Sequence, residues 1–154
     1  MKKIGTLVLV LFAFGIMKTN AQSDYKIAAG LGLDFGGGST FVGPSGKFFL
    51  AEQHAIQAEI MFETGRTLIT GIYQYHGDIT NADGLNWFAG GGLSIGFIEG
   101  GDSAFALRPT AGLEYRIPDV PLAFSFDWRP FIGLGDNAGN EVGAFGLGIR
   151  YVIE

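Results

Sequence analysis

Residues 85–115 decide the fold, and they read LNWFAGGGLSIGFIEGGDSAFALRPTAGLEY. On both sides of a turn signal at 99–102, every second residue is apolar or small, which is the period of a β-strand with one apolar face. Within each of these two strands, two aromatic residues stand ten positions apart on that face, and a segment near the start of the chain repeats the spacing. The pairs are Trp87 with Phe97, Phe105 with Tyr115, and Tyr25 with Phe35.

The ten-residue spacing predicts the height of the apolar face. At about 3.3 Å per residue, ten residues cover roughly 33 Å, and a strand tilt of about 40° reduces this to roughly 25 Å. That is the height of the lipid-facing band of an outer-membrane β-barrel, where aromatic side chains form a girdle at each membrane surface. We therefore expect two aromatic girdles, with Tyr25, Trp87 and Tyr115 at one end of the barrel and Phe35, Phe97 and Phe105 at the other.

Alternation of this kind recurs along the chain and is interrupted by turn signals rich in Gly, Asn, Asp and Pro. Six of the predicted strands have an outward set without a charged residue, whereas the second and fourth have apolar groups on both faces. The predicted fold class is all-β, an eight-stranded antiparallel up-and-down transmembrane β-barrel. The predicted strands lie near residues 24–35, 41–50, 55–64, 67–76, 85–98, 104–117, 121–132 and 143–153.

The opposite face of the six clearly alternating strands has charged residues of both signs, separated by small residues. A narrow barrel interior has room for such residues, and it requires buried charges to be paired. We expect them to form a charge network that fills the lumen and leaves no open pore. The five basic and five acidic residues are Lys26, Arg108, Arg116, Arg129 and Arg150, and Asp34, Glu59, Glu63, Glu114 and Asp127.

A soluble barrel of the lipocalin type is the alternative fold. It would turn its apolar face inward and cover its outside with many Lys, Glu and Thr side chains. Here the non-apolar face contains small residues and a balanced set of charges instead. The sequence therefore favours the membrane barrel.

The start of the chain has the three parts of an export signal. A basic start is followed by a largely apolar run over residues 4–17, and the small residues Thr19 and Ala21 stand at −3 and −1 to a cut after position 21. The apolar run is shorter than the roughly 20 residues that a membrane-spanning helix needs. We predict a cleaved signal peptide over residues 1–21 and one domain, the outer-membrane β-barrel, over residues 22–154.

Composition argues against several classes of protein. The chain has no cysteine, so it has no disulfide, no thiol nucleophile and no cysteine metal ligand. Without the basic residues of the predicted signal, 7 Lys and Arg remain against 15 Asp and Glu, a formal net charge of −8. Such a charge argues against a nucleic-acid partner. No spacing of residues indicates a catalytic, cofactor or metal site, and we expect none.

The export signal, the eight alternating strands, the short turns and the alternating apolar residues from Phe145 to Ile153 resemble the small outer-membrane barrels of the OmpX and OmpA-transmembrane-domain type. The ending Ile153-Glu154 departs from that family, which usually has a terminal aromatic residue. The resemblance implies a location in the bacterial outer membrane, with both chain ends in the periplasm. Its partners would be outer-membrane lipid, lipopolysaccharide and the barrel assembly machinery, and we expect a monomer.

The leading functional hypothesis is a non-enzymatic envelope protein with a structural or weak surface-contact role. Two alternatives stay open, an outer-membrane lipid-modifying enzyme and passage of small solutes through the lumen. Such enzymes use a histidine near the outer rim. The histidines of this chain, His54 and His76, fall at turns that the family topology puts in the periplasm, and we expect both to be solvated.

The step Arg-Pro occurs twice, at residues 108–109 and 129–130. A turn centred on Asp119-Val120 would set the two prolines opposite each other in a hairpin. Because proline has no N–H to donate, we expect a bulge or locally relaxed strand pairing there. We expect the two arginines to anchor interior salt bridges, and the alternative is a site in the outer half of the lumen that they form with Asp127.

Overall fold

Alternating residues place the chain in ten antiparallel β-strands in the computed structural model, which describes residues 25–135 and 139–154. The predicted signal peptide, residues 1–21, lies outside this range. The strands are β1 (Ile27–Gly36), β2 (Ser39–Ala51), β3 (His54–Glu63), β4 (Arg66–Asp78), β5 (Leu85–Ile98), β6 (Ser103–Arg116), β7 (Leu122–Trp128), β8 (Phe131–Leu134), β9 (Asn140–Glu141) and β10 (Phe145–Val152). In the described part of the chain, no helix is long and apolar enough to cross a membrane.

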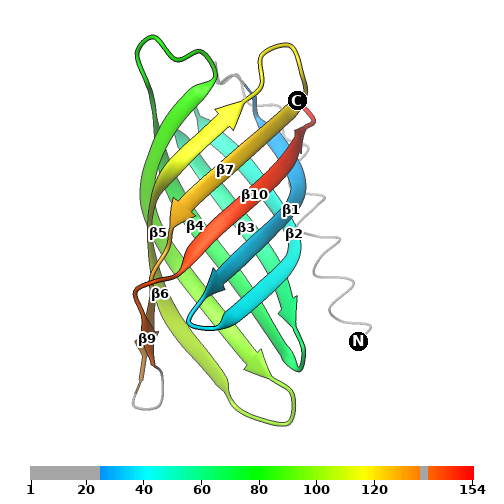
Figure 1. Ribbon diagram of the computed structural model, residues 1–154, viewed down its shortest axis with the longest axis vertical. Coiled ribbons are helices and arrows are strands. Elements are labelled where there is room, and N and C mark those ends of the chain that lie inside the picture. The colour runs from blue at the N-terminus through cyan, green and yellow to red at the C-terminus, as the bar shows by residue number, and fades with distance from the viewer. Residues whose placement is uncertain (1–24, 136–138) are drawn as a thin grey trace.

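The strands close into an eight-stranded barrel (Figure 1). Each of β1 to β6 pairs with the next strand along the barrel wall, and β1 pairs with β10 to close it. The short strands β8 and β9 pair with each other. β8 follows β7 and β9 precedes β10, so β7 and β8 share one position in the barrel and β9 and β10 share the next. The predicted eight-stranded antiparallel barrel is confirmed.

One predicted strand, 121–132, is divided in two. β6 pairs with β7 as far as Ala111 opposite Trp128, and it resumes with β8 at Leu107 opposite Ile132. Because the pairing advances by four residues on each side, the register is unchanged and the interruption covers the two Arg-Pro steps, as predicted. The left-handed Asp119, with φ 63°, forms part of the turn that sets this register.

The two prolines face each other across the interruption. The Arg129 N–H donates to the Ala144 carbonyl, toward β10, so the backbone nitrogen of the next residue, Pro130, faces β6. The Arg116 N–H donates to Gly84, toward β5. Successive backbone nitrogens of a strand point to opposite sides, and Pro109 lies an odd number of residues before Arg116 in β6. The backbone nitrogen of Pro109 therefore faces β7 and β8. Both donors of one ladder rung are missing, which explains why the pairing opens at this point.

The two ends of the barrel are different. At the terminal end, which we define by residues 25–27 and 152–154, the first and last described residues are bonded together: the Lys26 N–H donates to the Glu154 carbonyl at 2.5 Å, and the Ile153 N–H to the Ile27 carbonyl at 2.9 Å. At the opposite end, here called the far end, the β5–β6 hairpin and the β8–β9 extension project beyond the neighbouring strands (Figure 1).

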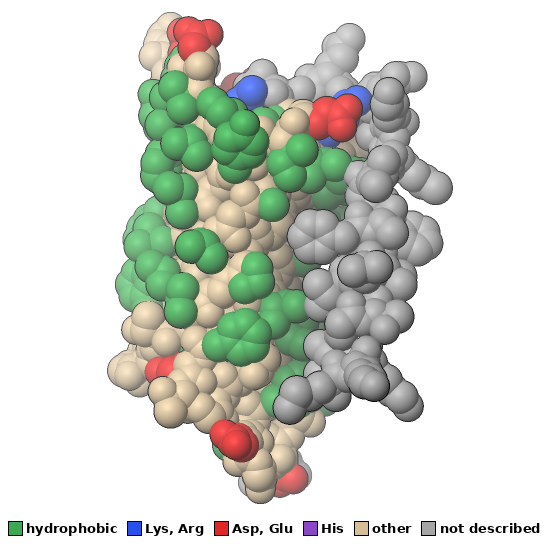
Figure 2. Space-filling model, turned by 90° about the vertical axis from the view of Figure 1, so that its right-hand side faces the viewer, with side chains coloured by type: hydrophobic (Ala, Val, Ile, Leu, Met, Phe, Trp, Pro, Cys, Tyr) green, Lys and Arg blue, Asp and Glu red, His purple; other side chains and the backbone are tan. Residues whose placement is uncertain are grey.

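The outward face of the wall is apolar over most of its height. Figure 2 shows hydrophobic side chains along the wall and charged side chains near its two ends. Four residues of the predicted girdles point outward and are 41–48% exposed, and Phe35 is half-buried; whether they meet a lipid interface stays a prediction. The four exposed aromatics are Trp87, Phe97, Phe105 and Tyr115.

Tyr25 corrects the predicted girdle, because it is only 5% exposed and lies inside the barrel. It precedes β1, so no strand pairing holds its side chain outward. Its ring packs edge-on against Phe49 at 4.9 Å between centroids, and its hydroxyl donates to Glu114. Pro130, two residues after the outward-facing Trp128, is also buried, at the interruption beside β8.

Glycine permits close approach of strands in the run of three glycines at residues 90–92. A Cβ atom at Gly90 would lie 1.9 Å from the Tyr73 carbonyl oxygen, and one at Gly92 would lie 1.9 Å from the Gly71 carbonyl oxygen. No side chain fits at such distances. These glycines therefore serve backbone packing between β4 and β5.

Candidate functional site: the charged interior

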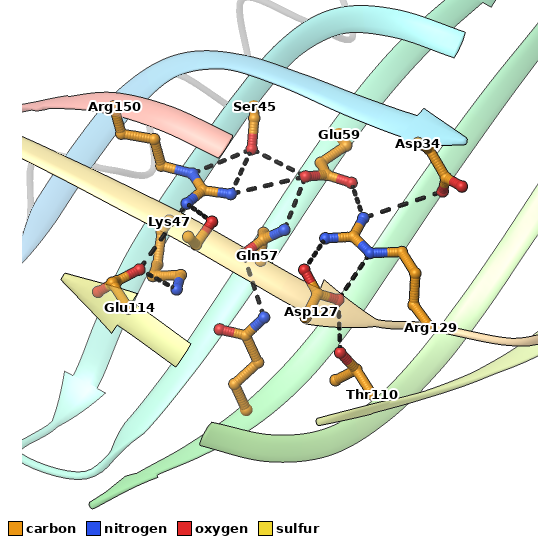
Figure 3. A network of polar contacts seen from close by, with 12 residues as sticks. Asp34, Ser45, Lys47, Gln57, Glu59, Thr110, Glu114, Asp127, Arg129 and Arg150 are labelled. Carbon is orange, nitrogen blue, oxygen red and sulfur yellow. Dashed lines mark hydrogen bonds and ion pairs between the residues drawn. The ribbon is translucent and has the colours of Figure 1, made fainter. Parts of the chain in front are cut away.

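The interior contains a balanced set of buried charges. Among the described residues, four basic and four acidic side chains are buried, each no more than 5% exposed. We call them the buried charge network, and Figure 3 shows most of it. Its members are Lys47, Arg108, Arg129 and Arg150, with Asp34, Glu59, Glu114 and Asp127. Equal numbers of each sign leave the interior formally neutral, as the cost of burying unpaired charge requires.

Arg129 is the most highly connected member. Its Nε and Nη2 atoms both donate to the Asp127 carboxylate at 2.7 Å, which makes a bidentate pair. Its Nη1 atom donates to Glu59 at 2.6 Å and lies 3.9 Å from Asp34. One guanidinium group thus joins carboxylates from β1, β3 and β7 across the lumen (Figure 3).

Arg150 occupies the next level toward the terminal end. It donates from Nε and Nη2 to the Ser45 hydroxyl, at 3.0 and 2.9 Å, and from Nη1 to the Ser125 hydroxyl at 3.0 Å. Two carboxylates stand slightly further away, Glu59 at 3.6 Å and Glu114 at 3.8 Å. Arg150 therefore connects the group around Arg129 with the group around Glu114.

Glu114 accepts from two side chains at the terminal end. The Lys47 ammonium donates to its Oε2 atom at 2.5 Å, and the Tyr25 hydroxyl donates to its Oε1 atom at 2.6 Å. Burial, followed by the negative charge of Glu114, raises the pKa of the Tyr25 hydroxyl well above its ordinary value. Tyr25 therefore stays a neutral donor.

Arg108 and Asp34 form the far-end part of the network. The Arg108 Nη2 atom donates to Asp34 at 2.7 Å and to the backbone carbonyl of Arg129 at 3.1 Å. That carbonyl belongs to the interrupted part of the wall, so the arginine side chain takes a backbone acceptor where the ladder is open. The guanidinium group also stacks on the ring of Phe131, with 5.4 Å between Cζ and the ring centroid.

Seven of the ten predicted lumen charges belong to this network, and three do not. Lys26, Glu63 and Arg116 are half-buried at the barrel ends rather than in the lumen. Glu63 forms an ion pair with Arg66 at the far end, and the Arg116 guanidinium lies over the ring of Tyr25 at the terminal end. Lys26 directly precedes β1, and Glu63 and Arg116 are the last residues of β3 and β6. At such positions the alternation of the strand no longer determines whether a side chain is buried.

Lys47 and His76 are interior residues that were missed from the sequence. Lys47 is buried in β2, whose apolar residues on both faces hid its direction. The alternation of Gly43, Ser45 and Lys47 was the available signal, but Phe49 also points inward and obscures it. His76, expected to be solvated, is 4% exposed because β4 continues to Asp78 and carries it into the barrel.

The terminal end of the lumen is closed by apolar side chains. His76 lies between the rings of Phe49 and Phe88, with centroids 4.9 and 5.2 Å away. A buried apolar cluster surrounds this level and comprises Tyr25, Ala28, Phe49, Ala55, Ala123 and Val152. The interior therefore has an apolar closure at one end and a salt-bridged middle.

The histidine and carboxylate side chains of the barrel are held mostly by neighbouring side chains. The described residues contain no group of three or more His, Cys, Asp or Glu side chains that could hold a metal ion. His54 contacts the hydroxyl of Tyr73 at the barrel surface, whereas His76 lies near Gln74, whose Oε1 is 3.2 Å from its Nε2. The carboxylates of the network are held by cations and hydroxyl groups, which suits packing rather than proton transfer.

Comparisons with protein-family models, with curated proteins and with solved structures gave no match for this chain.

Proposed function

We propose that this chain is an integral β-barrel protein of a bacterial outer membrane, with a closed lumen and a structural, non-enzymatic role in the envelope. One observation carries the proposal: the barrel has its charges inside and its apolar side chains outside. A soluble barrel of this size has the reverse arrangement, because water favours charges on its outer surface. Lipid as the surrounding solvent accounts for the inversion.

The distribution of exposed charge supports the same proposal. Within the strands, the exposed charged side chains are Arg66 and Asp78, the first and last residues of β4. Between the height of Arg66 at the far end and that of Asp78 at the terminal end, the outward side chains of the strands are apolar or small. An Arg or Lys side chain at the middle of a lipid-facing surface costs about 2–4 kcal/mol and an Asp or Glu side chain less, which explains their restriction to the ends.

The filled interior supports a structural role. Arginine side chains joined to carboxylates cross the lumen at the middle, and the apolar cluster closes the terminal end. Water-filled passage would require several of these ion pairs to separate at once, and each would leave a buried charge unpaired. We infer that the protein serves as a stable wall element or surface contact and not as a channel.

Reconstitution into lipid vesicles tests the membrane location. The two tryptophans, Trp87 and Trp128, are 41% and 43% exposed on the outside, so lipids with brominated acyl chains should quench both, measured one at a time in Trp87→Phe and Trp128→Phe variants. An aqueous quencher such as iodide should have little effect. Strong quenching by iodide, with none by brominated lipid, would contradict the proposal.

Two further measurements separate the alternatives. Mass spectrometry of lipid A from cells with and without the protein should give the same profile, and a protein-dependent change would favour the enzyme. Planar-bilayer recordings should show no stable large openings. Ion flux that depends on Arg129 or Glu114 would instead support passage through the lumen.

A further inference from the structure

A cavity opens at the far end of the barrel, above the buried charge network. Its volume is about 330 Å³, which lies at the lower end of the range of roughly 300–1,000 Å³ found for small-molecule sites. Asp34 and Arg108 form its floor, and Phe41, Leu68 and Phe131 belong to its lining. The lining comes from strands β1, β2, β4, β5, β6, β8 and β9, so it surrounds most of the far end rather than lying on one side.

The cavity is blind. Immediately beneath it, Arg108 is bonded to Asp34, and Arg129 joins Asp34, Asp127 and Glu59 across the lumen. The apolar cluster at the terminal end closes the other side. A molecule that enters from the far end therefore reaches a fixed floor and leaves by the way it came, which describes a binding pocket and not a pathway.

Each acidic group at the cavity has a donor on at least one of its oxygens. Asp34 accepts from Arg108 at 2.7 Å, and the Oε1 atom of Glu141 accepts from the Gly143 N–H at 2.8 Å. Glu63, at the rim, accepts from Arg66 and from the Thr40 N–H. A cationic ligand would have to compete with these bonds.

The basic groups at the cavity have donor atoms that are not all used within the protein. Among the described residues, the Nε atom of Arg108, a residue of the cavity lining, is buried without a hydrogen-bond partner. An unsatisfied buried donor costs about 1–3 kcal/mol, so a shift of the side chain that lets this donor reach an acceptor in the cavity is favoured. Arg66, with its side chain 41% exposed at the rim, has a guanidinium group that also faces solvent. The arginine donors that lack a partner or face solvent therefore favour an anionic ligand, which accepts hydrogen bonds.

Two aromatic rings complete the chemistry. The Arg66 guanidinium lies over the ring of Phe41 at 5.1 Å, and that of Arg108 over the ring of Phe131 at 5.4 Å. Such stacks hold the two planar cations against apolar walls, where an aromatic or short aliphatic body can pack while its charged group reaches a guanidinium. The first cation–ring pair comes from β2 and β4 and the second from β6 and β8, and neither β2 nor β4 is next to β6 or β8 in the barrel.

We propose that this cavity is a binding site for a small carboxylate with a compact apolar body, such as an aromatic acid. The carboxylate group accepts hydrogen bonds from Arg108 or Arg66, and the apolar body packs among Phe41, Leu68 and Phe131. This site goes beyond the structural role proposed above, and it does not depend on that role, because binding is measurable in detergent as well as in lipid.

The test is a titration of the folded protein in an uncharged detergent, followed by NMR of the aromatic and methyl groups. Benzoate is the probe, with benzyl alcohol as the uncharged isostere and benzylamine as the cation. Benzoate should bind saturably and at least tenfold more tightly than either, and its largest shifts should fall at Phe41, Leu68 and Phe131. Equal binding of the three probes, or no saturation by about 10 mM benzoate, would overturn the proposal.

Variants locate the site. Arg108→Gln should abolish the preference for benzoate, but it breaks the pair with Asp34 and the protein then needs a check of its folding. Arg66→Gln and Phe41→Leu change the rim and the wall without touching the salt-bridged floor, and each should weaken benzoate binding by about threefold or more. Arg116→Gln, at the terminal end, is the matched control. Loss of binding in that control, or full binding in both rim variants, would also count against the site.

Discussion

Replacing Arg129 by methionine should destabilise the barrel more than any other single replacement of a charged residue. Methionine has a similar length and fits an apolar lumen, so the change removes the charge and its hydrogen bonds with little loss of volume. Arg129 is 1% exposed and donates to Asp127 twice at 2.7 Å and to Glu59 at 2.6 Å. Without it, two contacting carboxylates lose their main cation. Breaking a buried pair in this way costs about 3–5 kcal/mol.

The assay is urea or guanidinium unfolding in lipid vesicles, followed by tryptophan fluorescence. Arg129→Met should lower the free energy of unfolding by about 3–5 kcal/mol, a large part of the roughly 5–15 kcal/mol that stabilises a typical domain. Arg66→Met is the control, because that side chain is 41% exposed and its pair with Glu63 is a surface pair, worth about 0–1 kcal/mol. Adding Asp127→Asn to Arg129→Met restores neutrality and should recover about 1–3 kcal/mol. A loss below about 1 kcal/mol in Arg129→Met would refute the reasoning.

Two further predictions concern the wall. Gly146→Ala should cost about 1–3 kcal/mol by overpacking, because its Cβ atom would lie 2.3 Å from the Nε atom of Arg129, whose guanidinium group is held in place. Gly71→Ala is the control, because a Cβ atom there would have no atom within 4 Å, and it should change the free energy of unfolding by less than about 0.5 kcal/mol. Equal effects of the two variants in the same unfolding assay would contradict this explanation. Replacing Pro109 and Pro130 together by alanine should return two N–H groups that face each other, and hydrogen exchange should then show protected amides at both positions. Rapid exchange there would mean that the interruption has another cause.

Strand alternation was enough to predict the barrel, because a wall with an apolar outer face and a polar inner face leaves few exceptions to its pattern. The strand from Leu85 to Ile98 was predicted to the residue. The register of β6 with the strands after it also followed from sequence, since the short turn at Asp119 leaves one pairing that keeps both apolar faces outward.

The interior was predicted less completely, for reasons that depend on position. Lys47 lies in a strand with apolar residues on both faces, so its direction could not be read from alternation. Tyr25 precedes the first strand, and the acceptor that draws it inward, Glu114, is 89 residues away in the chain. His76 was assigned to a turn because glycine follows it, yet β4 continues two residues further. Each error concerns a contact between distant segments or the end of an element, which a local pattern does not contain.

The two Arg-Pro steps connect the wall with the lumen. Each proline removes a ladder donor, and the arginine before it turns into the interior, so the same short segment weakens the wall and supplies the charges that fill it. The Arg129 carbonyl, in the interrupted segment, accepts from the side chain of Arg108 across the opening. Part of the hydrogen bonding lost between the strands is thereby replaced by a bond from the buried charge network. The stability of the far end of the wall and the integrity of that network should therefore change together, and Arg108 is the residue that couples them.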